Sequence, residues 1–264
     1  YDLRGEISRK IGYALAENYD RKIFRTIAKA ARKASPVTKA NYVEPGGTQI
    51  QVGAGSNADD ALDAAKLVTA FFDAAAALDE KGVSSEGRVG VLNPRQYYAL
   101  IQQVGENGLI NRDVQGSSLQ SGQGVVEIAG IKVYKSMNIP FFTKYGTKYA
   151  PASGASAATD LDTVNPGNTG SFTDVTMADE HNITVNDYGQ ASKFANTCGL
   201  IFQKEAAGVV EAIGPQVQVT SGDVSVIYQG DVILGRLAMG ADFLNPAAAV
   251  ELFAGTTTKP AAFG

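Results

Sequence analysis

A continuous amphipathic pattern over roughly the first thirty residues constrains the fold most. Its apolar residues recur at steps of three and four: Leu3, Ile7, Ile11, Ala14, Leu15, Ile23, Phe24 and Ile27. This spacing predicts one long α-helix. We expect the helix to end before Ser35-Pro36, because proline disfavours a helical conformation in the preceding residue. At 1.5 Å per residue such a helix is roughly 45 Å long, so we expect a structural spine.

Composition excludes several classes of protein and site. The chain has 264 residues, 44% of them hydrophobic, which suits one large domain or two small ones. A net charge of -4 gives no electrostatic argument for a nucleic-acid or membrane-surface protein. One cysteine and one histidine exclude a disulfide framework, a multi-cysteine zinc site and any site that needs two histidines. No apolar run approaches the ~18 residues of a membrane span.

The rest of the chain predicts a mixture of helices and strands, so the expected fold class is α+β. We expect helices from about 58 to 81 and from Asn93-Pro94 onward, with Asp59, Asp60 and Asp63 at the positive end of the first. Strands are expected at 48–52, 88–92, 200–203, 209–213, 216–220, 224–227 and 228–239, and two short strands around Ala129-Gly130 within 125–134. A helical turn is expected after Asn245-Pro246. The polar stretches 105–124 and 146–182 are expected to be long loops.

The segment Gly53-Ala54-Gly55-Ser56-Asn57-Ala58 is the strongest candidate for enzyme chemistry. It follows an expected strand and opens an expected helix, which is the context of a dinucleotide-binding turn. The three aspartates in the first turn of that helix would repel phosphate, and the expected first strand is polar. A plain turn is therefore the preferred interpretation, and a dinucleotide-binding α/β enzyme that uses Gly53-x-Gly55 stays an alternative.

The remaining reactive side chains favour structural roles. Consecutive residues point in different directions, so Asp179-Glu180-His181 is better explained as an acidic loop than as a metal site. Cys198 opens an apolar strand, which favours a buried thiol over a reactive one. The basic residues of the first helix are expected on a solvated face or at an inter-subunit contact: Arg21, Lys22, Arg25, Lys29, Arg32 and Lys33. We expect no catalytic, cofactor-binding or metal site.

Several segments, kept in order along the chain, resemble the major capsid proteins of T-seven-like short-tailed phages, the podovirus and cyanophage type. They are YDLRGEI at 1–7, GYALA at 12–16, Asp20, ALDEK at 77–81, RVGVLNPRQYY at 88–98, IAGIKV at 128–133, NIP at 138–140, AMGA at 238–241 and NPAAA at 245–249. The resemblance implies the Hong Kong 97-type capsid fold. Residues 1–54 with 208–254 would form a peripheral domain and 55–207 an axial domain, with 255–264 as a C-terminal tail. The family's N-terminal arm and extended loop are expected to be missing from this sequence.

The function implied by the resemblance is mechanical. Copies of the chain would assemble into hexamers and pentamers of an icosahedral phage head that encloses double-stranded DNA. The implied partners are the chain itself, scaffolding protein, portal protein, packaged DNA bound without sequence preference and a decoration protein, with no membrane. The implied location is the virion, after assembly in the host cytoplasm. An encapsulin-like nanocompartment shell is the alternative within the same fold. Candidate inter-subunit contacts lie on the long helix: Arg4, Arg9, Glu17, Arg21 and Arg25.

Overall fold

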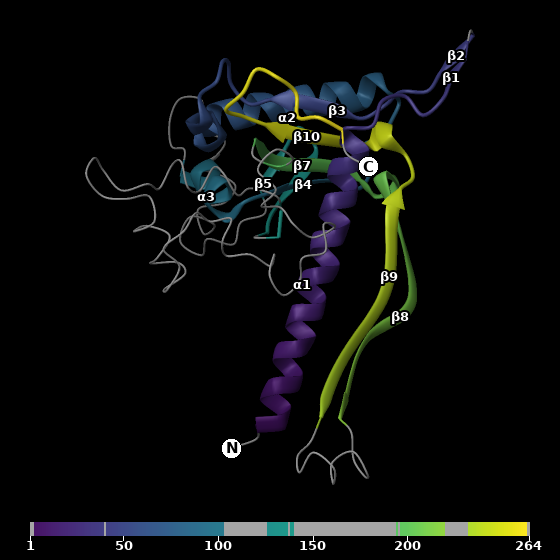
Figure 1. The fold of residues 1–264 in the computed structure, drawn as a ribbon. Helices are drawn as coiled ribbons and strands as arrows, with labels where there is room; N and C mark the ends of the chain where they lie inside the picture. Colours follow the sequence, from purple (N-terminus) through teal and green to yellow (C-terminus); the bar gives the residue numbers. More distant parts are fainter. Residues whose placement is uncertain are drawn as a thin grey trace.

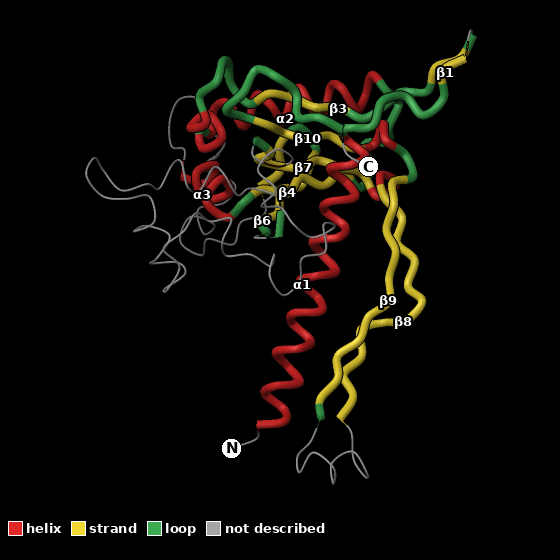
Figure 2. Tube along the Cα trace, viewed as in Figure 1, coloured by secondary structure: helices red, strands yellow, loops and turns green. Residues whose placement is uncertain are grey.

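A long helix and a long hairpin project from a body built around one mixed sheet (Figures 1 and 2). The computed structural model describes residues 3–39, 41–102, 126–136, 138–139, 194, 196–219 and 232–262. Helix α1 (Leu3–Ala31) is the long helix, and strands β8 (Ala207–Val219) and β9 (Ile233–Phe243) form the hairpin beside it. A second, very short hairpin pairs β1 (Thr38–Lys39) with β2 (Tyr42–Val43).

The sheet of the body has six strands in the order β3-β10-β7-β4-β6-β5. Their bounds are β3 (Thr48–Gln51), β4 (Arg88–Leu92), β5 (Val126–Ile128), β6 (Ile131–Lys135), β7 (Thr197–Gln203) and β10 (Ala249–Phe253). Strand β10 runs parallel to β3 and antiparallel to β7, and β4 runs antiparallel to β7 and parallel to β6. The sheet therefore brings the early strand β3 and the late strand β10 together at one edge.

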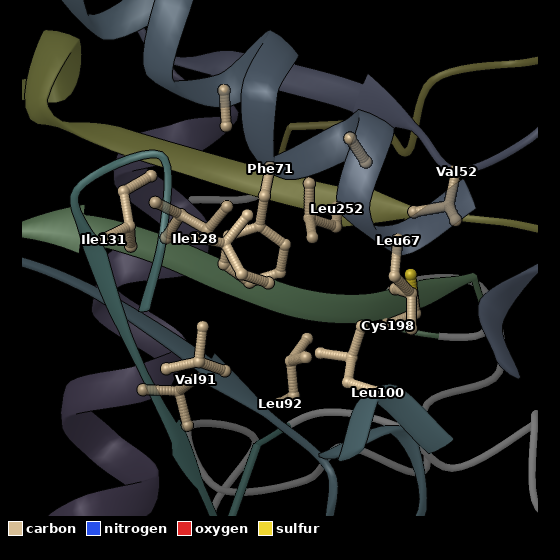
Figure 3. Packing of buried hydrophobic residues seen from close by; sticks show 14 of the residues in the cluster. Val52, Leu67, Phe71, Val91, Leu92, Leu100, Ile128, Ile131, Cys198 and Leu252 are labelled. Atoms are coloured by element: carbon tan, nitrogen blue, oxygen red, sulfur yellow. The ribbon is translucent and has the colours of Figure 1, made fainter. Parts of the chain in front are cut away.

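Two apolar clusters cover the two faces of this sheet. The larger cluster lies beneath α2 (Ala64–Glu80) and α3 (Pro94–Gln102), and includes Leu67, Phe71 and Leu100 (Figure 3). The smaller cluster joins the last turns of α1 to β7 and β10 through side chains such as Ile27 and Leu200. Every residue of β10 is buried, as expected for a strand packed on both faces.

Three short 3-10 helices complete the described elements: η1 (Ala58–Leu62), η3 (Lys204–Ala206) and η4 (Pro246–Ala248). The first of them corrects a prediction, since the helix expected from about 58 begins as an α-helix only at Ala64. The reason is local: the Asp63 side chain accepts a hydrogen bond from the backbone N–H of Ala65 and so caps α2. Asp60 does not lie free at a helix end either, because it is buried and pairs with Lys66 at 2.8 Å.

The β predictions need two further corrections. The strands expected separately at 209–213 and 216–220 form one strand, β8, whose register shifts between Glu211 and Ile213 and again between Ile213 and Gln216. After the turn at Asn245-Pro246 the chain enters β10, a strand that the sequence did not predict. The strand expected at 224–227 lies outside the described residues.

Candidate inter-subunit surface

The two ends of α1 have opposite environments. Its last turns are buried against the sheet, including Ile27, Ala28 and Ala31. Its first turns project away from the body, where Leu3 is 59% and Tyr13 65% exposed. The sequence pattern predicts one continuous buried apolar face along α1, but the described part of the chain buries only its C-terminal end.

The hairpin β8–β9 packs along the projecting part of α1. Gly235 on β9 allows this close approach, since a Cβ at that position would lie 2.3 Å from Ile11 Cγ2 on the helix. Tyr19 contributes on the β8 side, where burial and then the nearby Glu211 carboxylate raise the pKa of its phenol. We call this unit, residues 3–22 of α1 with β8 and β9, the stalk.

The stalk carries apolar side chains that the described part of the chain leaves more than a third exposed. The exposed members are Leu3, Ile7, Tyr13, Val209, Val210, Ile213, Val219 and Leu234. Scattered exposed apolar residues are normal on a protein surface, whereas a concentration of them on one projecting unit marks an interaction site. Because α1 and the hairpin cover each other's inner sides, these apolar residues lie on the outer side of the described part of the stalk.

Most of the charges expected to make inter-subunit contacts pair within the helix. Glu6 and Arg9 form an ion pair at 2.6 Å, and Glu17 and Arg21 form one at 2.7 Å. The Glu17–Arg21 pair has the i,i+4 spacing that stabilises helices by a few tenths of a kcal/mol. Arg4 is exposed near the tip of the stalk. Their role between subunits stays a prediction.

Arg25, the remaining candidate, is not on the projecting surface. It is only 8% exposed, and its guanidinium lies 5.7 Å from the centre of the Phe194 ring. Arg32 flanks the same ring at 5.0 Å. Arg25 therefore lies in the packing between the end of α1 and the body, a place that its position in the helix pattern did not reveal.

Two of the basic residues near the end of α1, Lys29 and Arg32, also form ion pairs within the chain. Lys29 pairs with Asp242 on β9 at 3.4 Å. Arg32 makes a two-pronged ion pair with Glu251 on β10, with Nε 2.7 Å from Oε2 and the second nitrogen 2.6 Å from Oε1. Thr197 on β7 and Gln49 on β3 also donate to Glu251. These contacts fix the base of the stalk to three strands of the sheet.

The same network holds the last described residues of the chain. Arg32 donates to the backbone carbonyl of Ala261 at 3.1 Å, and Gln49 donates to that of Pro260 at 2.9 Å. Sequence reasoning missed this junction. The available signal was Glu251, a charged residue inside the apolar run AVELF, since a buried charge requires a partner.

The Gly53 segment does not form a dinucleotide site. The α-helix that follows begins at Asp63–Ala64, so its N-terminus is separated from the glycines by η1. Strand β4, which follows α2, is separated from β3 by β10 and β7, whereas the dinucleotide-binding unit needs neighbouring parallel strands. Gly53 is required for a different reason: its φ is +75°, and a Cβ there would collide with the Asp60 carboxylate.

The other candidates are resolved in part. Cys198 is fully buried in the large cluster, as predicted. Asp179-Glu180-His181 lies outside the described residues. In the part of the chain that is described, no group of three or more His, Cys, Asp or Glu could hold a metal ion. Among the same residues, no helix has both the length and the apolar character to cross a membrane.

Comparisons with known proteins agree with this architecture. The capsid of the cyanophage P-SCSP1u contains a chain of similar structure, with a TM-score of 0.66 and 27% sequence identity over 97% of this chain and 67% of that one. The mature capsid of bacteriophage PhiM1 is similar at a TM-score of 0.57 and 16% identity, over 98% of this chain and 67% of that one. No curated protein matches the sequence.

The fold class predicted from the sequence, α+β of the Hong Kong 97 capsid type, is confirmed by these structures. The family of Gp10A-like proteins, described as major capsid proteins, matches residues 1–178. That match covers more than half of the chain and includes the whole of α1, β3, α2 and β4. The chain therefore belongs to the Gp10A-like family of major capsid proteins.

Proposed function

We propose that this chain is the repeating subunit of an icosahedral phage head, and that it assembles through its stalk into hexamers and pentamers around double-stranded DNA. The observation that carries the proposal is the stalk, a unit that projects from the body (Figure 1) and exposes several apolar side chains. A single subunit gains nothing from exposing such a surface, whereas a shell buries it against a neighbouring copy.

The chain is a structural protein of a bacteriophage capsid and not an enzyme, because its family and its fold are those of a major capsid protein. The alternatives raised by the sequence are not favoured. The similar structures with TM-scores of 0.66 and 0.57 are phage capsids, which argues against a nanocompartment shell. The topology around Gly53 argues against a dinucleotide-binding enzyme.

The domain division belongs to the proposal. Residues 1–54 with 208–254 would form the peripheral domain, and 55–207 the axial domain. Strands β3 and β10 from the first group share one sheet with β4, β5, β6 and β7 from the second. The proposed domain boundary therefore runs between the hydrogen-bonded strands β10 and β7 of this sheet.

The further partners are part of the same proposal. A shell of this kind would be built in the host cytoplasm on a scaffolding protein and around a portal protein. It would then hold DNA without reading its sequence, and its outer surface would be available to a decoration protein. The charged residues Arg4, Arg9, Glu17 and Arg21 would add weak contacts between subunits, since exposed ion pairs contribute about 0–1 kcal/mol each.

The test is electron microscopy of the chain, expressed alone and together with the scaffolding protein of its phage. Closed shells, or rings of five and six subunits, are the expected result in at least one of the two preparations. A monodisperse monomer in both preparations, measured by sedimentation velocity at micromolar concentration, would contradict the proposed assembly.

A further inference from the structure

A basic cavity of about 480 Å³ lies where α1 and α2 end beside the start of β3. Three lysines line it from three separate parts of the chain: Lys33 after α1, Lys81 after α2 and Lys259 near the C-terminus. Glu80 is the only acidic side chain among the residues that line it. We propose that this cavity is a binding site for a phosphate group, held by Lys33, Lys81 and Lys259.

The fold holds one of these lysines in place for binding. The Lys81 ammonium donates to the backbone carbonyl of Gly46 and to the Thr48 hydroxyl. An ammonium group has three N–H donors, so one stays available for an anion in the cavity. Among the described residues, no carboxylate lies within ion-pair distance of Lys33, Lys81 or Lys259.

The two cations contributed by the end of α1, Arg32 and Lys33, differ in how far the fold engages them. Arg32 lines the cavity, but its guanidinium is engaged by Glu251, Thr197 and the carbonyl of Ala261. The Lys33 ammonium lies 5.7 Å from the centre of the Phe243 ring, and the lysine stem is flexible enough to reach into the cavity. The positive charge of the three lysines is therefore not balanced by the single carboxylate, Glu80, that lines the cavity.

The electrostatics of Lys81 agree with this geometry. Burial first, and then the charge of Lys259, lower the pKa of Lys81. A bound phosphate would reverse the second effect and would form charge-assisted hydrogen bonds with both ammonium groups. The phosphate could be inorganic phosphate or a phosphate of the DNA backbone, and the test below separates these sources.

Phosphate binding at Lys259 would also affect how the C-terminal segment is attached to the body. Lys259 lies next to Pro260 and Ala261, whose carbonyls are held by Gln49 and Arg32. A phosphate that bridges Lys259 to Lys81 would attach this segment to the end of α2 as well. We therefore expect phosphate binding and attachment of the C-terminal segment to the end of α2 to occur together.

The test is calorimetric titration of the purified chain with inorganic phosphate, at constant ionic strength set with sodium chloride. We expect saturable binding, and we expect Lys33→Ala and Lys259→Ala each to weaken it at least about fivefold, because charged hydrogen bonds to phosphate are strong. Lys204→Ala is the matched control, since Lys204 is exposed and lies outside the cavity; it should leave the affinity unchanged. Lys81→Met is a weaker test, because Lys81 also supports the loop at Gly46.

A second readout does not depend on affinity. With lysines labelled at ¹³Cε, saturating phosphate should raise the apparent pKa of Lys81. A short DNA duplex, followed by fluorescence anisotropy, supplies the other arm. DNA binding that phosphate displaces and that Lys259→Ala weakens identifies the DNA backbone as the source, and phosphate binding without DNA binding identifies free phosphate.

Three results would overturn the site. The first is an absence of saturable phosphate binding, whatever DNA does. The second is equal weakening by Lys204→Ala and Lys259→Ala, which would indicate a general surface effect. The third is binding of hexaglutamate in the absence of phosphate binding, which would assign the cavity to a carboxylate of a protein partner. None of these results depends on whether the chain forms shells.

Discussion

At the scale of single residues, the Arg32–Glu251 pair is the contact whose loss should matter most. Both side chains have 0% exposure. Arg32→Met would leave the Glu251 carboxylate buried with only Thr197 and Gln49 as donors. Removing one partner of a buried pair costs about 3–5 kcal/mol, so we expect the free energy of unfolding to fall by that amount in urea titrations followed by circular dichroism.

The double variant Arg32→Met with Glu251→Leu is the matched control. It removes the unpaired charge and replaces both side chains by apolar ones, so most of the lost stability should return. A single substitution that costs less than about 1 kcal/mol would contradict the role given to this pair, because a solvated carboxylate needs no partner.

At the scale of elements, the contact between α1 and β9 depends on the absence of a side chain at Gly235. Gly235→Ala would place a Cβ 2.3 Å from Ile11 Cγ2 and push the two elements apart. Overpacking of this kind costs about 1–3 kcal/mol. We expect a lower melting temperature and faster amide hydrogen exchange in the first turns of α1.

Gly240→Ala provides the comparison on the same strand. A Cβ at Gly240 would meet no atom within 4 Å. This variant should be neutral or slightly more stable, since alanine restricts the unfolded chain. Equal destabilisation by both variants would show that the strand tolerates no side chain at all, and the specific Ile11 contact would then be wrong.

The contact between α1 and β8 predicts a dependence on alkaline pH. The pKa of Tyr19 is raised in the fold, so folding favours the neutral phenol. Its contribution to stability is complete below the ordinary tyrosine pKa of 10.0 and is lost as the pH rises through the raised value. Tyr19→Phe should therefore flatten the fall in melting temperature as the pH rises above 10.0, the ordinary tyrosine pKa.

Tyr13→Phe is the control, because the Tyr13 side chain is 65% exposed on the same helix. It should keep the alkaline fall of the unsubstituted chain. An unchanged fall in Tyr19→Phe would contradict the raised pKa of the Tyr19 phenol beside Glu211.

The elements differ in how far the sequence alone predicts them. The apolar period predicts α1 to within a few residues of its end at Ala31, and Asn93-Pro94 predicts the start of α3. The start of α2 was wrong because three nearby aspartates compete to cap it, and only the structure shows that Asp63 does so. The Arg32–Glu251 pair joins residues 219 positions apart, and the cavity brings Lys259 beside Lys33 and Lys81. Such contacts leave no local pattern in the sequence.

At the scale of the whole molecule, the stalk determines how a subunit meets its neighbours. Val210 is 73% exposed on β8 and Leu234 is 50% exposed on β9. The pair of substitutions Val210→Thr and Leu234→Gln would remove apolar surface without adding charge. Burying one such side chain contributes about 1.5–3 kcal/mol, so we expect the protein concentration needed for shell assembly to rise roughly tenfold or more. The isolated subunit should unfold at an unchanged urea concentration, because neither side chain is buried within it.

Gln218→Thr is the control, because Gln218 is an exposed polar residue on the same strand as Val210. This substitution should leave assembly unchanged in light-scattering titrations. If the apolar variant assembles at the same concentration as Gln218→Thr, the outer side of the hairpin is not a contact between subunits, and the uncovered residues at the start of α1 would have to supply it.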